Sequence, residues 1–234
     1  MYQELSWQSI KEKGKQIWYN ISNLMKKKIR VVSFDVDGTL INQEFNDLIW
    51  ENEIPSLVAK ERGWSFNRAK DFCLFEYDKV GEKDTRWYDI EYWLDKFGIK
   101  IPAIDIFKKW EKAIIVYPDV ISTLKRTAEK GVRPIVITCM PRIFLKEKIH
   151  TFEYFFEKVF STISDFREVK TPEVYLRIAK IIEVEPSSIL HIGDHPVLDY
   201  EFSRQADYHS LLIERGMKSN EHSIETLTEI FKFL

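Results

Sequence analysis

The stretch VVSFDVDGTLIN, residues 31–42, decides the fold and places two carboxylates close together. Its first four residues are typical of a buried β-strand. Asp35 and Asp37 follow, two positions apart, and Gly38 and Thr39 come directly after them. In open parallel sheets, ligands bind at the carboxyl ends of the strands. The stretch therefore predicts a strand that delivers two acids to a binding site at its end.

The composition is that of a folded protein without a global charge bias. The chain has 234 residues, of which 44% are hydrophobic and 14% aromatic, and its net charge is −2. These residues are sufficient to fill a core, and the charge gives no reason to expect nucleic acid or a membrane as a partner. Cys73 and Cys139 are too few for a disulfide framework and lack a zinc-site spacing. We therefore expect a cytoplasmic protein, and leave open whether it is a monomer or a homodimer.

Residues 1–28 are expected to form an amphipathic helical extension. Apolar residues recur near helical spacing from Trp7 to Leu24, among basic residues that outnumber the acids. A helix packed on its own domain with a solvated lysine face fits this pattern, and so does a helix on an anionic membrane surface. We favour the packed helix.

Residues 45–117 have a helical pattern throughout. Four segments carry apolar residues at spacings of three and four, and glycine or proline separates them. Five of the seven tryptophans lie in this region and none follows Trp110. This composition indicates a separate helical unit that is inserted after the first strand.

Residues 118–234 alternate between helices and short apolar strands. Strands are expected at 133–138, 158–163, 187–193 and 209–213, and helices at 119–130, after Pro141, from Pro172, at 198–206 and at 223–233. Such alternation favours a parallel sheet with helices on both faces. We therefore predict an α/β fold whose core comprises residues 29–44 and 118–234, with the helical unit at 45–117 as an insertion.

Several predicted strands end in acids or a hydroxyl. Asp35 and Asp37 follow the first strand, Thr138 ends the second, and Asp194 follows a later one, with Asp199 five residues further on. Clustered carboxylates repel one another unless a cation or a proton balances them. Mg²⁺ accepts a small number of hard oxygen ligands together with water and phosphate. The sequence therefore predicts a magnesium site at the strand ends.

A site of this composition suits phosphoryl transfer. Asp35 fits a carboxylate nucleophile that attacks phosphorus, and Asp37 fits an acid and base that moves the proton of the leaving alcohol. Gly38 allows close approach of the backbone to phosphate, and Thr138 offers a hydroxyl. A lone Asp-x-Asp is common in surface turns, but this ordered series of strand ends is difficult to explain by packing alone.

The chain resembles the haloacid dehalogenase-like (HAD) hydrolase superfamily over about residues 29–216. FDVDGTLIN is similar to its first motif, VIT to its second, REVKTPEVY to its third and HIGDHPVLD to its fourth. The resemblance implies a Rossmann-like core. It also implies that residues 45–117 are a type I helical-bundle cap, which closes over the site and selects the substrate.

The resemblance also implies a role for each site residue. Asp35 would be the nucleophile and Asp37 the acid/base, and Lys170 would neutralise charge. The residues implied to bind the phosphate are Gly38, Thr138, Cys139 and Lys170. The groups implied to hold Mg²⁺ are Asp35, the backbone carbonyl of Asp37, and Asp194, with Asp199 in support.

The chain departs from the family pattern at two positions. Cys139 stands where many relatives have asparagine. We interpret it as a buried packing residue, and a reactive thiol is the alternative. Lys170 lies one residue closer to the following proline than in many relatives, and Lys146 and Lys148 are the alternative lysines.

Other residues near the motifs have two interpretations. His195 fits a residue that satisfies the loop backbone, and it also fits a contact to the phosphate or the leaving group. Four basic residues of the helical unit fit contacts to an anionic substrate or solvated surface positions. They are Arg68, Lys79, Lys83 and Arg86.

Asp37 is the residue that indicates the reaction. By resemblance, dehalogenases lack an acid at this position, so Asp37 favours phosphoester hydrolysis. We predict a Mg²⁺-dependent phosphomonoester phosphatase that acts on a small phosphorylated metabolite through an aspartyl-phosphate. A phosphomutase, a haloacid dehalogenase and a non-catalytic binding protein on the same scaffold remain alternatives. A receiver-type signalling domain does not fit, because receivers have no comparable insertion after their first strand.

Overall fold

The computed structural model describes residues 29–234, so the extension expected over residues 1–28 lies outside them. Six parallel strands form a single sheet in the order β3-β2-β1-β4-β5-β6. The strands are β1 (Val31–Phe34), β2 (Arg133–Thr138), β3 (Lys158–Ser161), β4 (Ile189–Gly193), β5 (His209–Ile213) and β6 (Ser223–Ile224). The predicted α/β fold with a Rossmann-like parallel sheet is confirmed.

The position of β1 in the sheet determines where a site forms. All residues of β1 and β4 are buried, as expected for strands that are covered on both faces. Val31 pairs with Arg133 of β2 on one side and with Ile189 of β4 on the other. The strand order reverses between β1 and β4, and at such a switch point the loops after the two strands diverge and leave a crevice.

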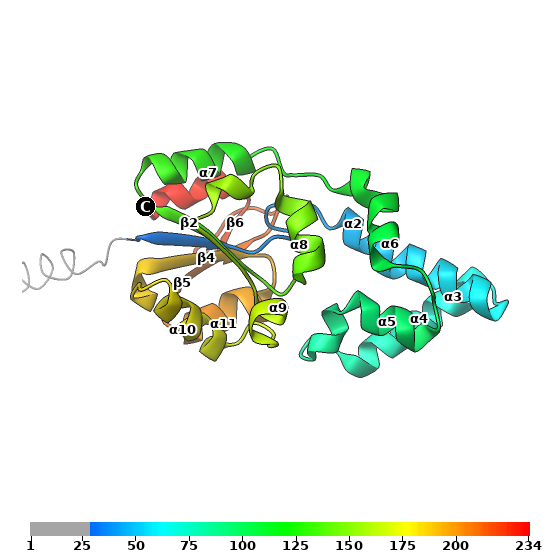
Figure 1. Ribbon diagram of the computed structural model, residues 1–234. Helices are drawn as coiled ribbons and strands as arrows, with labels where there is room; N and C mark the ends of the chain where they lie inside the picture. The colour runs from blue at the N-terminus through cyan, green and yellow to red at the C-terminus, as the bar shows by residue number, and fades with distance from the viewer. Residues whose placement is uncertain (1–28) are drawn as a thin grey trace, which may run out of the picture.

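Helices cover both faces of this sheet (Figure 1). Helix α7 and the C-terminal 3₁₀-helix η7 pack on one face, and α10 and α11 pack on the other. Neighbouring residues of β1 accordingly contribute to different clusters, Val32 to the core under α7 and Val31 to the core under α10. The core helices are α7 (Val120–Glu129), α8 (Arg142–Ile149), η4 (Glu153–Phe155), α9 (Thr162–Phe166), α10 (Pro172–Ile181), η5 (Pro186–Ser188), η6 (Pro196–Glu201), α11 (Phe202–Gln205) and η7 (Leu227–Lys232).

Three predicted elements differ from the structure in ways that have a clear cause or consequence, while others, such as the strand expected at 187–193 that begins at Ile189, differ only slightly at their ends. The helix expected at 223–233 begins as strand β6, which pairs with β5, and only the later residues form η7. The strand expected at 158–163 stops at Ser161, because the Ser161 hydroxyl accepts a hydrogen bond from the Ser164 N–H and caps α9. The helix expected at 198–206 begins earlier, at Pro196, as the π-helical turn η6.

A helical bundle is inserted after β1 and lies beyond the carboxyl ends of the strands (Figure 1). Its core contains the fully buried Trp93, which packs against Tyr77 and Phe97. All four helical segments expected between residues 45 and 117 are present. The bundle elements are α2 (Glu44–Asp47), η1 (Leu48–Glu53), α3 (Ile54–Arg62), α4 (Phe66–Val80), η2 (Thr85–Tyr88), α5 (Ile90–Phe97), α6 (Ala103–Trp110) and η3 (Glu111–Ala113).

The two chain segments that connect the bundle to the sheet run side by side. Ile41 and Val116 form an antiparallel bridge. The Asn42 N–H donates to the Ile115 carbonyl at 3.0 Å, and the Asn42 side chain accepts from the Ile115 N–H at 3.2 Å. This pairing ties both ends of the bundle to the loop that follows β1. Within residues 29–234, no helix has the length and apolar character needed to cross a membrane.

Candidate active site

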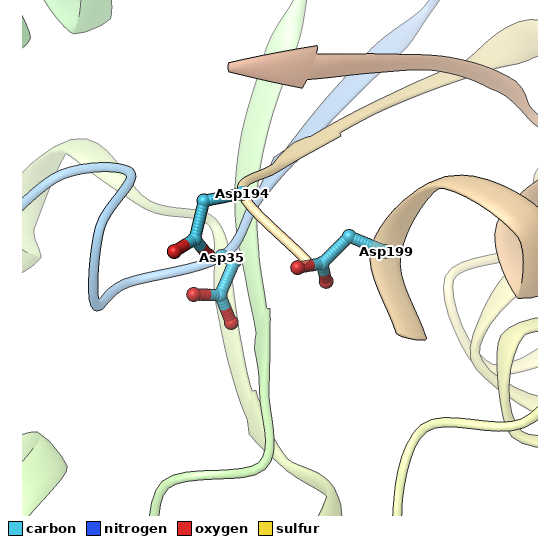
Figure 2. Close-up of side chains that lie close together, drawn as sticks. All are labelled: Asp35, Asp194 and Asp199. Carbon is cyan, nitrogen blue, oxygen red and sulfur yellow. The ribbon is translucent and has the colours of Figure 1, made fainter. Parts of the chain in front are cut away.

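Three of the acids expected in the site meet at the switch point of the sheet. Asp35 follows β1, Asp194 follows β4, and Asp199 lies in η6. Figure 2 shows their carboxylates directed toward one place. Each offers an oxygen within 4.8 Å of the others. The Asp35 N–H donates to the Ile192 carbonyl at 2.8 Å, so the sheet itself positions the first acid.

Two glycines make this approach of the acids possible. Gly38 has φ of +70°, and a Cβ at this position would overlap the carboxylate of Asp194. A Cβ on Gly193 would overlap the carboxylate of Asp199. Gly38, which was expected to allow close backbone approach, therefore lies directly against an acid of the cluster.

Lys170 is the buried cation of the cluster. Its side chain is 3% exposed, and its Nζ lies 2.5 Å from Asp35 Oδ1 and 2.5 Å from Asp199 Oδ1. Burial alone would lower the pKa of Lys170, but Asp199 and Asp35 together raise it well above its ordinary value. Among the three lysines that the sequence offered, Lys170 is the one that contacts Asp35.

The buried acids differ in how well their charges are balanced. Burial raises the pKa of Asp35 to about 8, although Lys170 acts to lower it. Burial and the neighbouring Asp199 raise the pKa of Asp194 to about 6. Asp199 itself has a lowered pKa, because Lys170 and His191 outweigh the effect of burial. The side of the cluster formed by Asp35 and Asp194 therefore needs a further cation or a proton.

Asp199 is held by several donors that sequence analysis did not identify. Its Oδ1 lies 3.1 Å from His191 Nε2, and its Oδ2 accepts from the His195 N–H at 3.1 Å. Ser33 Oγ and the Tyr175 hydroxyl contact the two ring nitrogens of His191 at 2.8 and 3.0 Å. Asp194 is different, because the Gln43 amide is its only side-chain donor among residues 29–234, at 3.1 Å.

Asp37 lies apart from this cluster and has its own lysine. Lys148 of α8 is 2% exposed. Its Nζ donates to Asp37 Oδ1 at 2.6 Å and to Asn46 Oδ1 of α2 at 2.8 Å. Burial lowers the pKa of Lys148, although Asp37 acts to raise it. The sequence offered Lys148 only as an alternative to Lys170, whereas the structure brings it to the other aspartate.

Thr138 and Cys139 end β2 beside the acids. The Thr138 hydroxyl accepts a hydrogen bond from the Met140 N–H at 3.2 Å. The Cys139 thiol accepts from the Lys170 N–H at 3.4 Å, and burial raises its pKa. A buried thiol of raised pKa is a poor nucleophile, which supports the interpretation of Cys139 as a packing residue. Contact of either residue with phosphate stays a prediction.

A cavity of about 410 Å³ extends from the strand ends to the helical bundle. It is lined by Asp35, Asp37, Thr138, Lys148, Lys170 and Asp194, among others. His195 also lines it, and its Nδ1 accepts from the N–H groups of Val197 and Leu198 at 3.2 and 3.1 Å. His195 therefore satisfies the loop backbone, as one of its two interpretations held. Its Nε2 also lies 3.1 Å from Glu82 of the bundle.

The four basic residues that were considered for substrate contact do not line this cavity. Lys79 pairs with Glu76 at 2.6 Å, and Arg86 pairs with Asp84 at 2.6 Å. Arg68 lies over the ring of Trp64, 4.1 Å from its centroid. The structure therefore gives no support to an anionic-substrate contact for these residues.

Comparison with known families agrees with this arrangement. A family model described as haloacid dehalogenase-like hydrolase matches residues 29–207. The chain belongs to this hydrolase family. The match includes all of the acids described above.

Two characterised relatives are similar over part of their length. The GMP/IMP nucleotidase YrfG of Escherichia coli is 23% identical over 116 residues, which are 50% of this chain and 51% of that protein. Phosphoglycolate phosphatase 1 of Pseudomonas aeruginosa is 25% identical over 180 residues, which are 70% of this chain and 62% of that protein. The alignment with the nucleotidase thus spans about half of its length.

Solved structures of the family share the fold. A HAD phosphatase from Thermococcus onnurineus superimposes with a TM-score of 0.77 at 22% identity, covering 87% of this chain and 96% of that one. L-2-haloacid dehalogenase from Xanthobacter autotrophicus gives a TM-score of 0.58 at 14% identity, covering 87% and 97%. At these identities the likeness shows the fold alone.

Proposed function

We propose that the protein is a Mg²⁺-dependent phosphomonoester phosphatase that works through an aspartyl-phosphate on Asp35. The observation that carries this proposal is the placement of Asp35 at the end of β1, between Lys170 and the Asp194 carboxylate, with Asp37 two residues further on. The names of two relatives, a nucleotidase and a phosphatase, support it. We also propose residues 29–44 and 118–234 as the catalytic core and residues 45–117 as its cap.

The acid cluster fits a magnesium ion. Asp35 and Asp194 have raised pKa values, and Asp194 has only an amide donor as its side-chain partner within the described chain. We assign Asp35, Asp194 and the backbone carbonyl of Asp37 as ligands, with Asp199 in support. Bound there, Mg²⁺ would neutralise phosphoryl oxygens and the acids themselves.

The residues of the chain divide the reaction into two displacements. An Asp35 oxygen attacks phosphorus and forms the acyl-phosphate bond, while the ester bond breaks and Asp37 donates a proton to the leaving alcohol. A water molecule then gives a proton to Asp37 and attacks the phosphorus, which releases phosphate and restores Asp35. Lys170 stabilises the charge of the phosphoryl oxygens and Asp35, and Lys148 holds Asp37 in place.

A dehalogenase and a phosphomutase, the alternative enzymes of this family, would need different properties of the same cavity. A dehalogenase displaces halide and has no need of the proton that Asp37 carries. A phosphomutase must exclude water and hold a bisphosphate, so it would isomerise a sugar phosphate instead of hydrolysing it. We take the substrate to be a small phosphorylated metabolite, because the bundle stands over the cavity and limits the size of the leaving group. Two free, buried cysteines support a cytoplasmic location for the protein.

Hydrolysis of para-nitrophenyl phosphate tests the proposed function directly. We expect the purified protein to release nitrophenolate when Mg²⁺ is present, to stop when EDTA removes the metal, and to recover when Mg²⁺ is restored in excess. Absence of magnesium-dependent hydrolysis of this ester and of alkyl phosphates would refute the assignment.

The acid role of Asp37 predicts a dependence on the leaving group. We expect Asp37→Asn to slow hydrolysis of an alkyl phosphate by about 100-fold or more, because an alkoxide cannot leave without a proton. The loss should be much smaller with para-nitrophenyl phosphate, because nitrophenolate needs little protonation. The measurement is kcat for both esters in each variant.

The contact between Lys148 and Asp37 can be tested with the same two esters. If the lysine positions Asp37, Lys148→Met should produce the same leaving-group dependence, whereas a general loss of structure would slow both esters equally. Lys146→Met is the matched control, because Lys146 lies on the same helix, is exposed and does not line the cavity. An equal loss for both esters in Asp37→Asn would instead indicate a structural or metal-binding role for Asp37.

A further inference from the structure

The helical bundle contributes an acidic wall to the cavity. Four carboxylates from the bundle line it: Asp47, Glu51, Asp78 and Glu82. Residues 45–117 contain twelve lysines and arginines, yet none of them lines the cavity. Every charged residue that the bundle contributes to the cavity lining is therefore an acid.

Two of these carboxylates have neither a lysine, an arginine nor a histidine partner within the described residues. Glu51 pairs with Lys70 at 3.0 Å, and Glu82 lies 3.1 Å from His195. Within residues 29–234, Asp47 and Asp78 have no ion pair. Burial and the neighbouring Glu51 and Glu44 raise the pKa of Asp47, as expected for a carboxylate in negative surroundings.

The lysines of the cavity do not balance this wall. Lys170 contacts Asp35 and Asp199, and Lys148 contacts Asp37. Their positive charges therefore offset carboxylates at the strand ends, where the phosphoryl group would bind. On the bundle side of the cavity, Asp47 and Asp78, both exposed to solvent, keep negative charges that no ion pair within residues 29–234 offsets.

Aromatic residues of the bundle line the cavity together with these carboxylates. They are Trp50, Tyr77, Trp87 and Tyr88. The rings of Trp50 and Tyr77 meet edge to face with centroids 5.7 Å apart, and those of Trp87 and Tyr88 lie 5.0 Å apart. The faces of aromatic rings attract ammonium groups, and combined with carboxylates they suit a small organic cation.

We propose that the leaving group is an amino alcohol, so that the substrate is the phosphate monoester of a small amino alcohol. The phosphoryl group would lie at the strand ends and the ammonium group against the wall that carries Asp47 and Asp78. This inference rests on the proposed phosphatase function. It disfavours a leaving group with a carboxylate, such as the glycolate in the name of the Pseudomonas aeruginosa relative, because the like charges would repel.

A matched set of esters tests the inference. With Mg²⁺ present, we expect kcat/KM for phosphoethanolamine and phosphocholine to exceed that for phosphoglycolate by about tenfold or more. In the double variant Asp47→Asn/Asp78→Asn this ratio should fall toward one, mainly through a higher KM for the cationic esters. Asp71→Asn is the control, because Asp71 is an exposed residue of α4 that does not line the cavity, and the ratio should not change.

Failure of this inference is distinct from failure of the proposed function. Hydrolysis of para-nitrophenyl phosphate without a preference for the cationic esters would overturn the inference alone, as would preferred hydrolysis of a sugar phosphate or a nucleoside monophosphate. Calorimetric binding of phosphoethanolamine and phosphoglycolate to the Asp35→Asn variant tests the preference without turnover. Tighter binding of phosphoglycolate there would overturn the inference even if no ester is hydrolysed.

Discussion

The Asp35→Asn variant is expected to lose at least about a thousandfold in kcat, for para-nitrophenyl phosphate and for alkyl phosphates alike. The amide of asparagine is not a nucleophile, so no acyl-phosphate bond can form. A loss that does not depend on the leaving group distinguishes Asp35 from Asp37. The control variant Asp95→Asn should retain full activity, because Asp95 is an exposed residue of α5 that does not line the cavity.

The same variant should remain folded, which makes the activity loss interpretable. The pKa of Asp35 is raised to about 8, so in the absence of metal the folded protein favours the neutral side chain at neutral pH. Asparagine is neutral and nearly the same size. We therefore expect a melting temperature in EDTA at neutral pH that is no lower than that of the wild type. Activity of Asp35→Asn within tenfold of the wild type would contradict the assignment of the nucleophile.

The Lys170→Met variant is expected to lose the most stability, about 3–5 kcal/mol in the free energy of unfolding. The Lys170 ammonium lies 2.5 Å from both Asp35 and Asp199, and all three side chains are buried. Removing the cation leaves Asp199, whose pKa is lowered, as a buried carboxylate without its ammonium partner, and it also removes the donor to Asp35. Denaturant unfolding in EDTA measures this loss of stability. In a separate assay with Mg²⁺ present, turnover should also fall sharply. Lys180→Met is the control, because Lys180 is an exposed residue of α10.

The stability deficit of Lys170→Met should depend on pH. Without the ammonium, the pKa of Asp35, which is already raised, rises further in the folded variant, and the lowered pKa of Asp199 rises as well. A group with a raised folded pKa takes up its proton more readily when folded, so its unfavourable contribution grows as the pH rises through that pKa and disappears as the pH falls. We therefore expect the deficit to shrink as the pH is lowered below about 8, the pKa of Asp35. A deficit that stays constant as the pH falls would indicate lost packing instead of lost charge.

The sheet and the acids at its edge could be predicted from the sequence because their signals are local. Apolar runs such as VVSF identify strands that are buried on both faces, and alternation with helices requires them to be parallel. Parallel strands bring their carboxyl ends to the same edge, so Asp35 and Asp194 were expected at one edge, and the pairing of β1 with β4 makes them neighbours. Lys170 was identified only through the resemblance of its surrounding motif.

The remaining features depend on packing between distant segments. Lys148 and Asp37 are 111 residues apart, and Gln43 and Asp194 are 151 apart. No local pattern marks such pairs. Strand β6 has two residues and lies within a helix-like pattern, so only its pairing with β5 reveals it. The acidic wall of the cavity likewise depends on the direction of bundle side chains, which sequence periodicity does not give.

The measurement that tests the central claim most directly is a search for the aspartyl-phosphate. Enzyme is mixed with substrate and Mg²⁺, the reaction is stopped with acid within a single turnover, and the peptides are analysed by mass spectrometry. We predict a phosphoryl group on the peptide that contains Asp35, removable with hydroxylamine and absent in Asp35→Asn. Release of phosphate during that turnover without phosphorylation of this peptide, together with retained activity of the variant, would contradict the account.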